Sequence, residues 1–495
     1  MKKEIKNKIV KHKKIILATI VTLIFFIGLV KVEYSRCTFR MFINDYSVEF
    51  NHFLTLGRYI VAIWWKIVSV LKFNLSQTYF VSYAMAIIFM ILSLYKTQNI
   101  VEKLIKKDTT QNWKKDILVL TISILITVNP FVIELFLYLE KGCMVMSLFF
   151  AIFAAEKMLN YFENRKIRDI IKTTVCILIS AFCYQGATLM YLAFAFVFAV
   201  KYAKNIKQFI FNNIIISIPF LLGYGINFIC IKLFFTSVRI AGHINLVENL
   251  KVIGQKISQL LIDNFGTLPK FSIIIGVMAL FVITCIYSYK NKQIKYVFAV
   301  VYIYLATLVI ILVPQLVLET NSVQILARSS IPYGGIIGII LLYMVSEINF
   351  NKTTQKIIYG IITLIILVEF IYMQITIIDH YKINNLDLNT VNTIKECIEE
   401  YEKETQNTVD KIVLYRDKEV KRYYPKLKSY GQINEKIISI DARILDVLEY
   451  ISNKRYQQIP DKNSEYEEFF KENDWDYFDK EQLKFENDTL HLCIF

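Results

Sequence analysis

The sequence predicts an all-α membrane protein with about eleven transmembrane helices and a small α/β domain at its C-terminal end. The chain of 495 residues is 55% hydrophobic and has a mean hydropathy of +0.43, which is more apolar than an ordinary soluble protein. Before residue 379 there are 39 basic and 17 acidic residues, whereas 18 basic and 25 acidic residues follow. This change of charge divides the chain into a transmembrane domain, 1–378, and a C-terminal domain, 379–495.

Apolar runs of about the length that crosses a bilayer recur through the first domain. They are 15–32, 78–95, 116–138, 143–159, 169–184, 187–201, 209–235, 271–289, 297–316, 330–347 and 357–378. Asn129-Pro130 interrupts the third run. The first run follows a lysine-rich tail, but no small-x-small cleavage site comes after it, so we expect an uncleaved membrane helix.

Lysine-rich segments predict the orientation of the chain, because basic residues are enriched on the cytoplasmic side of a membrane. With eleven spans, all basic segments fall on one side: the N-terminal tail, 96–115, 160–169, 201–207, 289–295 and the region of Lys352 and Lys356. We therefore expect a cytoplasmic N-terminus and an extracytoplasmic C-terminal domain. The same distribution explains the net charge of +15, because basic residues at the membrane surface contact anionic lipid headgroups. No nucleic acid partner is needed to account for it.

Two further segments are expected to lie on the membrane surface. Segment 59–72 is apolar but short, and its Trp64-Trp65 pair is typical of a helix at headgroup depth. A span at this point would invert every later segment and place the lysine-rich loops outside. In loop 236–270, apolar residues recur at three- and four-residue spacing, which predicts a second surface helix.

The C-terminal domain combines helix and strand patterns. A helix is expected to begin near Asp387 or Asn389, either of which is a suitable cap. Residues 411–417 have the composition of a strand, and 482–495 that of a hairpin with Asn487-Asp488 at its turn. These patterns indicate a small α/β fold.

A polar, aromatic-rich segment, 34–58, follows the first span and carries candidate catalytic groups. Asn44 and Asp45 lie within it, and Gly57-Arg58 ends it. At the membrane surface a carboxylate such as Asp45 can take a proton from a substrate hydroxyl, and an arginine fork fits phosphate oxygens. Two alternatives stay open: Asp45 is also well suited to cap a helix, and Arg58 to extend toward the interface.

Other ionisable groups flank the spans on the same side as Asp45 and are functional candidates by default. They are Glu49, Glu134, Glu140, Lys141, Arg239, His243, Glu319 and Arg328. Structural alternatives exist here too, because Glu134 could pair with Lys141, Asn129-Pro130 could simply end a helix, and Gln185-Gly186 could form a tight turn. No HxH, HExxH or CxxC spacing occurs, so no metal site is indicated.

Three stretches resemble the bacterial membrane glucosyltransferases of the type II O-antigen-glucosylating family, which have the GT-C architecture. They are Ile43-Asn44-Asp45 with Gly57-Arg58, Asn129-Pro130-Phe131 with Glu134 and Tyr138, and Tyr184-Gln185-Gly186-Ala187. Arg328 also matches a position where members tend to have arginine. The resemblance extends to about residue 345. The chain departs from the pattern where Asn44 replaces the first acid of a pair, and where Leu139-Glu140-Lys141 replaces a basic–aromatic–acid stretch.

The resemblance implies a glycosyltransferase of a bacterial cell membrane that transfers a sugar, expected to be glucose, from undecaprenyl phosphate to a cell-surface glycopolymer. Asp45 would be the base of an inverting displacement, and the substrate-binding residues would be Asn44, Arg58, Glu134, Lys141, Gln185 and Arg328. One carboxylate fits inversion, because retention through a covalent intermediate uses two. No cofactor is expected, and the need for a divalent metal stays open.

Two other functions are compatible with the same membrane architecture. A polymerase or ligase of surface polysaccharide would also use lipid-linked sugars, but it usually depends on a large outer loop between later spans. A flippase or transporter of lipid-linked sugars tends to show internal repeats and helix pairs broken by glycine or proline. The chain has only 15 Gly and 7 Pro and no visible repeat, so we rank the enzyme first.

Overall fold

The structure is a computed structural model in which the chain forms two compact units. It describes residues 2–31, 34–35, 37–43, 46–105, 112–234, 245–316, 318–348, 350–416, 428–438, 441–460, 463–473 and 475–494. Unit 1 contains Met1–Lys31 and Glu49–Ile375, and unit 2 contains Val32–Val48 and Thr376–Phe495. Part of the polar segment 34–58 therefore belongs to the same unit as the C-terminal region.

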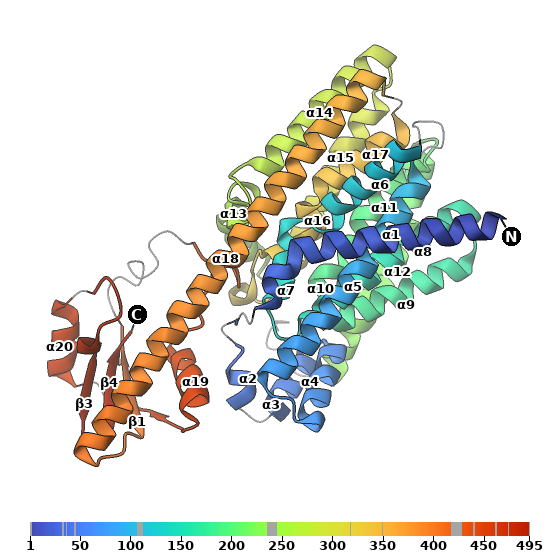
Figure 1. The fold of residues 1–495 in the computed structure, drawn as a ribbon. Coiled ribbons are helices and arrows are strands. Elements are labelled where there is room, and N and C mark those ends of the chain that lie inside the picture. Colours follow the sequence, from blue (N-terminus) through green and yellow to red (C-terminus); the bar gives the residue numbers. More distant parts are fainter. Residues whose placement is uncertain are drawn as a thin grey trace. The chain divides into compact units, whose positions relative to one another are not determined.

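Seven helices among the described residues are long and apolar enough to cross a membrane (Figure 1). They lie in α1 (Lys2–Phe26), α5 (Leu75–Leu104), α8 (Lys141–Asn164), α12 (Ile206–Phe234), α14 (Ser272–Asn291), α15 (Lys295–Leu316) and α18 (Lys352–Thr405). An eighth is the bent series α6 (Asn112–Thr127), η2 (Pro130–Val132) and α7 (Ile133–Phe136), if it is one span. The structure thus supports a multi-pass membrane protein, while the expected count of eleven is not confirmed.

The remaining apolar runs fold into shorter helices of unit 1, of which α11 and α17 lie in the interior. They are α9 (Ile167–Cys183), α10 (Gln185–Thr188), α11 (Met190–Lys201), α16 (Ile331–Gly334) and α17 (Ile336–Glu347). Residues 190–199 of α11 and 336–346 of α17 are all buried, whereas α12 and α14 expose many large apolar side chains. A helix enclosed by other helices can be short or broken, because its backbone groups find partners in the protein rather than facing lipid.

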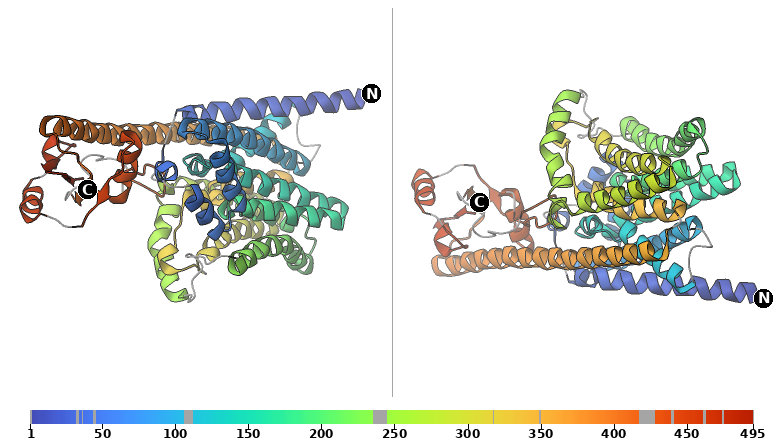
Figure 2. Two further views of the ribbon diagram at one scale, coloured as in Figure 1. Left: turned by 90° about the horizontal axis from the view of Figure 1, so that it is seen from below. Right: turned by 90° about the horizontal axis from the view of Figure 1, so that it is seen from above.

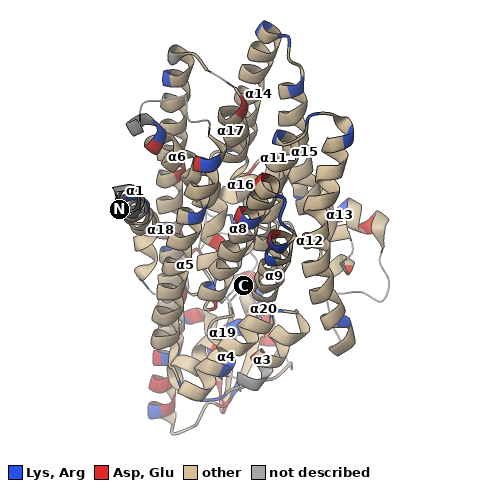
Figure 3. Cartoon of the chain, turned by 90° about the vertical axis from the view of Figure 1, so that its right-hand side faces the viewer, with Lys and Arg blue, Asp and Glu red and all other residues tan. Residues whose placement is uncertain are grey.

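Polar contacts distinguish the two ends of the helix bundle in unit 1. At one end, here called the basic end, the ion pairs of the described residues include Lys14–Glu102, Lys96–Glu156 and Lys201–Glu347. At the other, called the cavity end, the Tyr79 hydroxyl donates to the carbonyl oxygens of Leu29 and Lys31, both at 2.7 Å. Helices α14 and α15 carry their charged residues at their ends (Figure 3). The basic residues that cluster in short segments of the sequence therefore also lie near one another in the structure.

The surface segments are helical, as the sequence predicts. Segment 59–72 forms α4 (Tyr59–Leu71), and loop 236–270 contains α13 (Leu246–Leu261). Their depth in a membrane stays a prediction. The shorter elements of unit 1 are η1 (Ile27–Val30), η3 (Asn264–Gly266), η4 (Thr320–Ser322) and η5 (Ala327–Ser329), and α3 (Tyr46–Thr55) begins in unit 2 and continues into unit 1.

Helix α18 corrects the prediction of a separate helix that begins near Asp387 or Asn389. It is continuous over 54 residues, which corresponds to about 80 Å. No proline occurs in it, and its one glycine, Gly360, lies in the apolar half, so nothing interrupts the backbone hydrogen bonds where the composition changes. Asp387 is no cap: its carboxylate accepts from the Ile437 N–H at 2.6 Å.

Unit 2 is a small α/β fold built on a four-stranded sheet of order β2-β1-β4-β3. The elements besides α18 are α2 (Arg40–Ile43), β1 (Lys411–Tyr415), α19 (Asp441–Ser452), β2 (Gln457–Gln458), α20 (Ser464–Glu472), η6 (Lys480–Gln482), β3 (Leu483–Glu486) and β4 (Thr489–Cys493). Strand β1 is parallel to β2 and β4, and β3 and β4 are antiparallel. The predicted strand is confirmed over 411–415 and the predicted hairpin over 483–493, while Asp417 and Phe495 lie outside the described residues.

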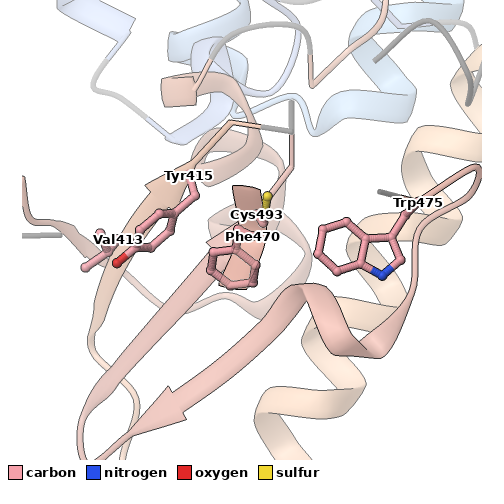
Figure 4. Packing of buried hydrophobic residues seen from close by; sticks show 5 residues of the cluster. All are labelled: Val413, Tyr415, Phe470, Trp475 and Cys493. Atoms are coloured by element: carbon pink, nitrogen blue, oxygen red, sulfur yellow. The ribbon is translucent and has the colours of Figure 1, made fainter. Parts of the chain in front are cut away.

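Side chains alternate between the two faces of the sheet, and helices cover both faces. On one face Val413, Tyr415 and Cys493 pack with Phe470 of α20 and with Trp475 (Figure 4). On the other face Phe485 stacks on Tyr401 of α18, with ring centroids 4.5 Å apart. Burial of both faces is what allows a sheet with parallel strands to be stable.

Candidate functional site

A cavity of about 240 Å³ lies at the cavity end of unit 1. Its walls come from the turn 55–58, from the break between α9 and α10, from the second half of α12, and from the end of α15 with the following loop. The lining residues are Thr55, Leu56, Arg58, Tyr184, Gln185, Gly186, Leu189, Tyr224, Asn227, Phe228, Ile231, Ile311, Pro314, Gln315, Leu318, Ser322, Gln324, Leu326, Arg328 and Ser329. Three predicted site residues, Arg58, Gln185 and Arg328, therefore share one cavity.

The turn before Arg58 is fixed by contacts with two other helices. Gln185 donates from Nε2 to the Leu56 carbonyl at 2.8 Å, and Asn227 donates from Nδ2 to the Gly57 carbonyl at 2.7 Å. Gly57 has a φ of +70°, and a Cβ added there would lie 2.4 Å from Cδ1 of Ile231. Only glycine fits this left-handed position so close to α12. The Gly57-Arg58 pair thus forms a turn that directs the Arg58 side chain toward the cavity.

Arg58 faces the cavity from a half-buried position. Its guanidinium carbon lies 4.8 Å from the centre of the Tyr184 ring, within the range of a cation–π contact. Its Nε is buried and has no hydrogen-bond partner among the described residues. A half-buried guanidinium with an unused donor is suited to bind an anionic ligand.

Arg328, on η5, is held by Glu134 of α7. Glu134 Oε2 accepts from the Arg328 backbone N–H at 2.7 Å, and Oε1 pairs with the guanidinium. Glu134 is fully buried and does not line the cavity, whereas the Arg328 side chain is 14% exposed. Burial is the largest influence on the pKa of Arg328 and lowers it, but the Glu134 carboxylate together with Tyr138 and Tyr184 outweighs burial, so the pKa rises above its ordinary value. Glu134 therefore positions a cation rather than contacting a ligand.

Lys141 and Glu140, at the start of α8, are buried next to this region. Lys141 Nζ lies 3.5 Å from the centre of the Tyr79 ring, and Lys141 does not line the cavity. Burial raises the pKa of Glu140, while the guanidinium groups of Arg58 and Arg328 act in the opposite direction. Among the described residues the ion pair of Glu134 is with Arg328, rather than the alternative pair with Lys141.

The predicted catalytic residue Asp45 and its neighbour Asn44 lie outside the described residues, and so do Arg239 and His243. Two cavity residues, Tyr224 and Asn227, were not among the sequence candidates. Asn227 carries a signal that sequence reasoning could have used, since it is a side-chain amide in the middle of the apolar run 209–235.

A further polar group, Glu369, is buried in the apolar half of α18 and was also missed. It is 3% exposed, and its Oε2 has no hydrogen-bond partner within the described part of the chain. Helices α18 and α1 lie side by side here (Figure 2): Gln374 donates from Nε2 to the Phe25 carbonyl at 2.9 Å, and Phe370 contacts the Phe25 ring. An acid inside an apolar run is itself a sequence signal.

Comparisons with family models, with curated proteins and with solved structures found no match to this chain. Among the described residues, no group of three or more His, Cys, Asp or Glu side chains could hold a metal ion. The cavity and the sequence pattern are therefore the features of this protein that bear on its function.

Proposed function

We propose that the protein is a membrane glycosyltransferase that takes a sugar from a polyprenyl phosphate and transfers it to a cell-surface glycopolymer. The observation that carries the proposal is that two arginines, Arg58 and Arg328, line one cavity at the end of a bundle of apolar helices. Two guanidinium forks match the oxygens of a phosphate, and binding it in a partly dehydrated cavity strengthens each contact.

The apolar wall of the cavity supports a lipid-linked ligand. Helices α12 and α15 pack together toward the basic end, where the rings of Phe209 and Tyr302 are 4.9 Å apart. Toward the cavity end they contribute lining residues, including Ile311 and Phe228, and Phe228 is 41% exposed on the outside of unit 1. An apolar surface that continues from a cavity to the outside of the bundle suits an isoprenoid chain in the bilayer.

The proposed chemistry is a single inverting displacement. The acceptor hydroxyl oxygen forms a bond to the anomeric carbon as the bond from that carbon to the phosphate oxygen breaks. The hydroxyl proton passes to the Asp45 carboxylate, and the electron pair of the broken bond stays on the lipid phosphate, where arginines stabilise the charge. The role of Asp45 depends on its place in the sequence, next to Asn44 and thirteen residues before Arg58.

Replacement of Asp45 tests the proposal. Asp45→Asn keeps the size and hydrogen-bonding capacity of the side chain but cannot accept the proton, so kcat should fall by roughly 10²–10⁴-fold with little change in donor KM. The assay measures incorporation of labelled glucose from polyprenyl-phosphate-glucose into the glycopolymer by purified, reconstituted protein. Asn44→Asp is the matched control, and its effect should be far milder.

Near-normal transfer by a well-expressed Asp45→Asn protein would return Asp45 to a capping role, because asparagine is itself a good cap. Absence of any transfer by the wild-type protein would refute the transferase.

The second candidate is a transporter of lipid-linked sugars, and Glu369 is the observation that favours it. An acid buried within a membrane helix is typical of ion-coupled transport. If vesicles translocate the lipid-linked sugar with Asp45→Asn but not with Glu369→Gln, transport is the better description.

A further inference from the structure

Residues 34–35 and 37–43, which lead to Asn44 and Asp45, are packed into unit 2. The Tyr34 N–H donates to Asn384 Oδ1 at 2.6 Å, and Asn384 Nδ2 and His380 Nε2 lie 3.2 Å from the Tyr34 carbonyl. Asn384 and His380 belong to α18, and each is 1% exposed. Tyr34, at the start of the polar segment 34–58, is therefore hydrogen-bonded to α18 just after its apolar half.

Helix α2, at the end of this stretch, packs on α19. The ring of Tyr450 contacts Phe39 at 5.2 Å and Phe42 at 6.4 Å, and Phe39 is 2% exposed. Arg455, just after α19, donates to the Ile43 carbonyl and also pairs with Glu449 at 2.7 Å. The last described carbonyl before Asn44 is thus held by a side chain from the C-terminal region.

From these contacts we infer that the C-terminal unit positions the segment that carries the catalytic carboxylate, with Tyr450 and Arg455 as its positioning residues. Sequence alone offers no role for the C-terminal region, and the contacts give it one. The inference rests on the proposed function, in which Asp45 takes the proton. Positioning matters because a displacement of about 1 Å of a reacting group can lower a rate by roughly 100-fold.

The test is the double variant Tyr450→Ala/Arg455→Ala in the full-length, reconstituted protein. Hydrogen–deuterium exchange of the peptide amides of residues 37–43 should accelerate, because α2 loses its contacts with α19. The kcat for transfer should fall by roughly 10–100-fold, while donor KM stays unchanged, because Arg58 and Arg328 belong to unit 1. Arg455→Lys, which keeps a donor at this position, should be closer to the wild type.

Lys454→Ala is the matched control. Lys454 precedes Arg455 and pairs with Glu402 at 2.5 Å, and within the described residues it has no hydrogen bond to 34–35 or 37–43. The inference is overturned if exchange in 37–43 is the same in the double variant and in Lys454→Ala, or if exchange accelerates while kcat is unchanged. Failure of the proposed function would be seen separately, as absence of transfer by the wild type, and the exchange measurement would still decide whether the C-terminal unit holds the segment.

Discussion

At the scale of single residues, Glu134 of the Asn-Pro stretch holds Arg328, which comes from a distant part of the chain. The two residues are separated by 194 positions, yet both carboxylate oxygens of Glu134 bond to Arg328. Such a buried pair adds little net stability, but removal of one partner leaves a buried charge without compensation. The acid in the Asn-Pro stretch is therefore needed to hold a cavity cation.

Glu134→Gln should accordingly destabilise the protein by about 3–5 kcal/mol and raise donor KM, because an amide cannot accept from both Arg328 donors as an anion does. The measurements are the unfolding midpoint of the detergent-solubilised protein and the donor KM. The control is Glu156→Gln, which breaks the pair with Lys96 near the basic end and should leave donor KM unchanged. An unaltered KM in Glu134→Gln would remove Arg328 from donor binding.

At the scale of elements, two broken helices cross where α6 ends and α16 passes into α17. Asn129 caps η2 by accepting from the Phe131 N–H at 3.2 Å, and it donates to the Ile126 carbonyl at 2.9 Å. The breaks are stable because Asn129 supplies hydrogen bonds that the interrupted helix lacks, and because glycines on the other helix allow close approach.

Gly338→Ala should disturb this crossing. A Cβ at Gly338 would lie 2.6 Å from Ile126 Cγ1 and 2.9 Å from its backbone nitrogen, so the loss of stability should be about 1–3 kcal/mol, as is typical of overpacking. Gly360→Ala is the control, since no atom of the described residues lies within 4 Å of its Cβ position and alanine favours a helix by roughly 0.5–1 kcal/mol. Denaturant unfolding of both variants gives the comparison, and equal stability of Gly338→Ala and the wild type would contradict the crossing.

At the scale of the whole molecule, the orientation of the chain across the membrane decides on which side the proposed donor cavity lies. The lysine-rich loops predict one face of the membrane, and the ion pairs of the basic end gather at one end of the bundle in unit 1, opposite the cavity. A donor cavity at the extracytoplasmic end would meet a polymer outside the cell.

Single cysteines in a background without native cysteines test this orientation. Asp45→Cys and Tyr477→Cys should react with a membrane-impermeant maleimide on intact cells, since Tyr477 is 75% exposed. Thr110→Cys should react only after permeabilisation, because Thr110 lies in the basic segment 96–115, which is predicted to be cytoplasmic. Labelling of Thr110→Cys on intact cells would refute the predicted topology and with it the placement of the cavity.

The sequence by itself determined the local features of this protein. Apolar run length predicted helices at every expected span, and alternating apolar residues around Asn487-Asp488 predicted the hairpin of β3 and β4. These features depend on neighbours along the chain, so a pattern of a few residues suffices. The sequence also made Arg58 and Arg328 site candidates as charged residues beside apolar runs, and the resemblance added Gln185.

Only the tertiary structure decided which of these residues meet and in what role. It joined Arg58, Gln185 and Arg328 in one cavity, made Glu134 a support for Arg328, and assigned residues 34–43 to the C-terminal unit. It also kept short helices such as α11 and α17 in the interior, where burial replaces length as the source of stability. The physical reason is that such contacts join residues far apart in the chain, and no local pattern encodes which distant partner satisfies a buried charge or fills a gap beside a glycine.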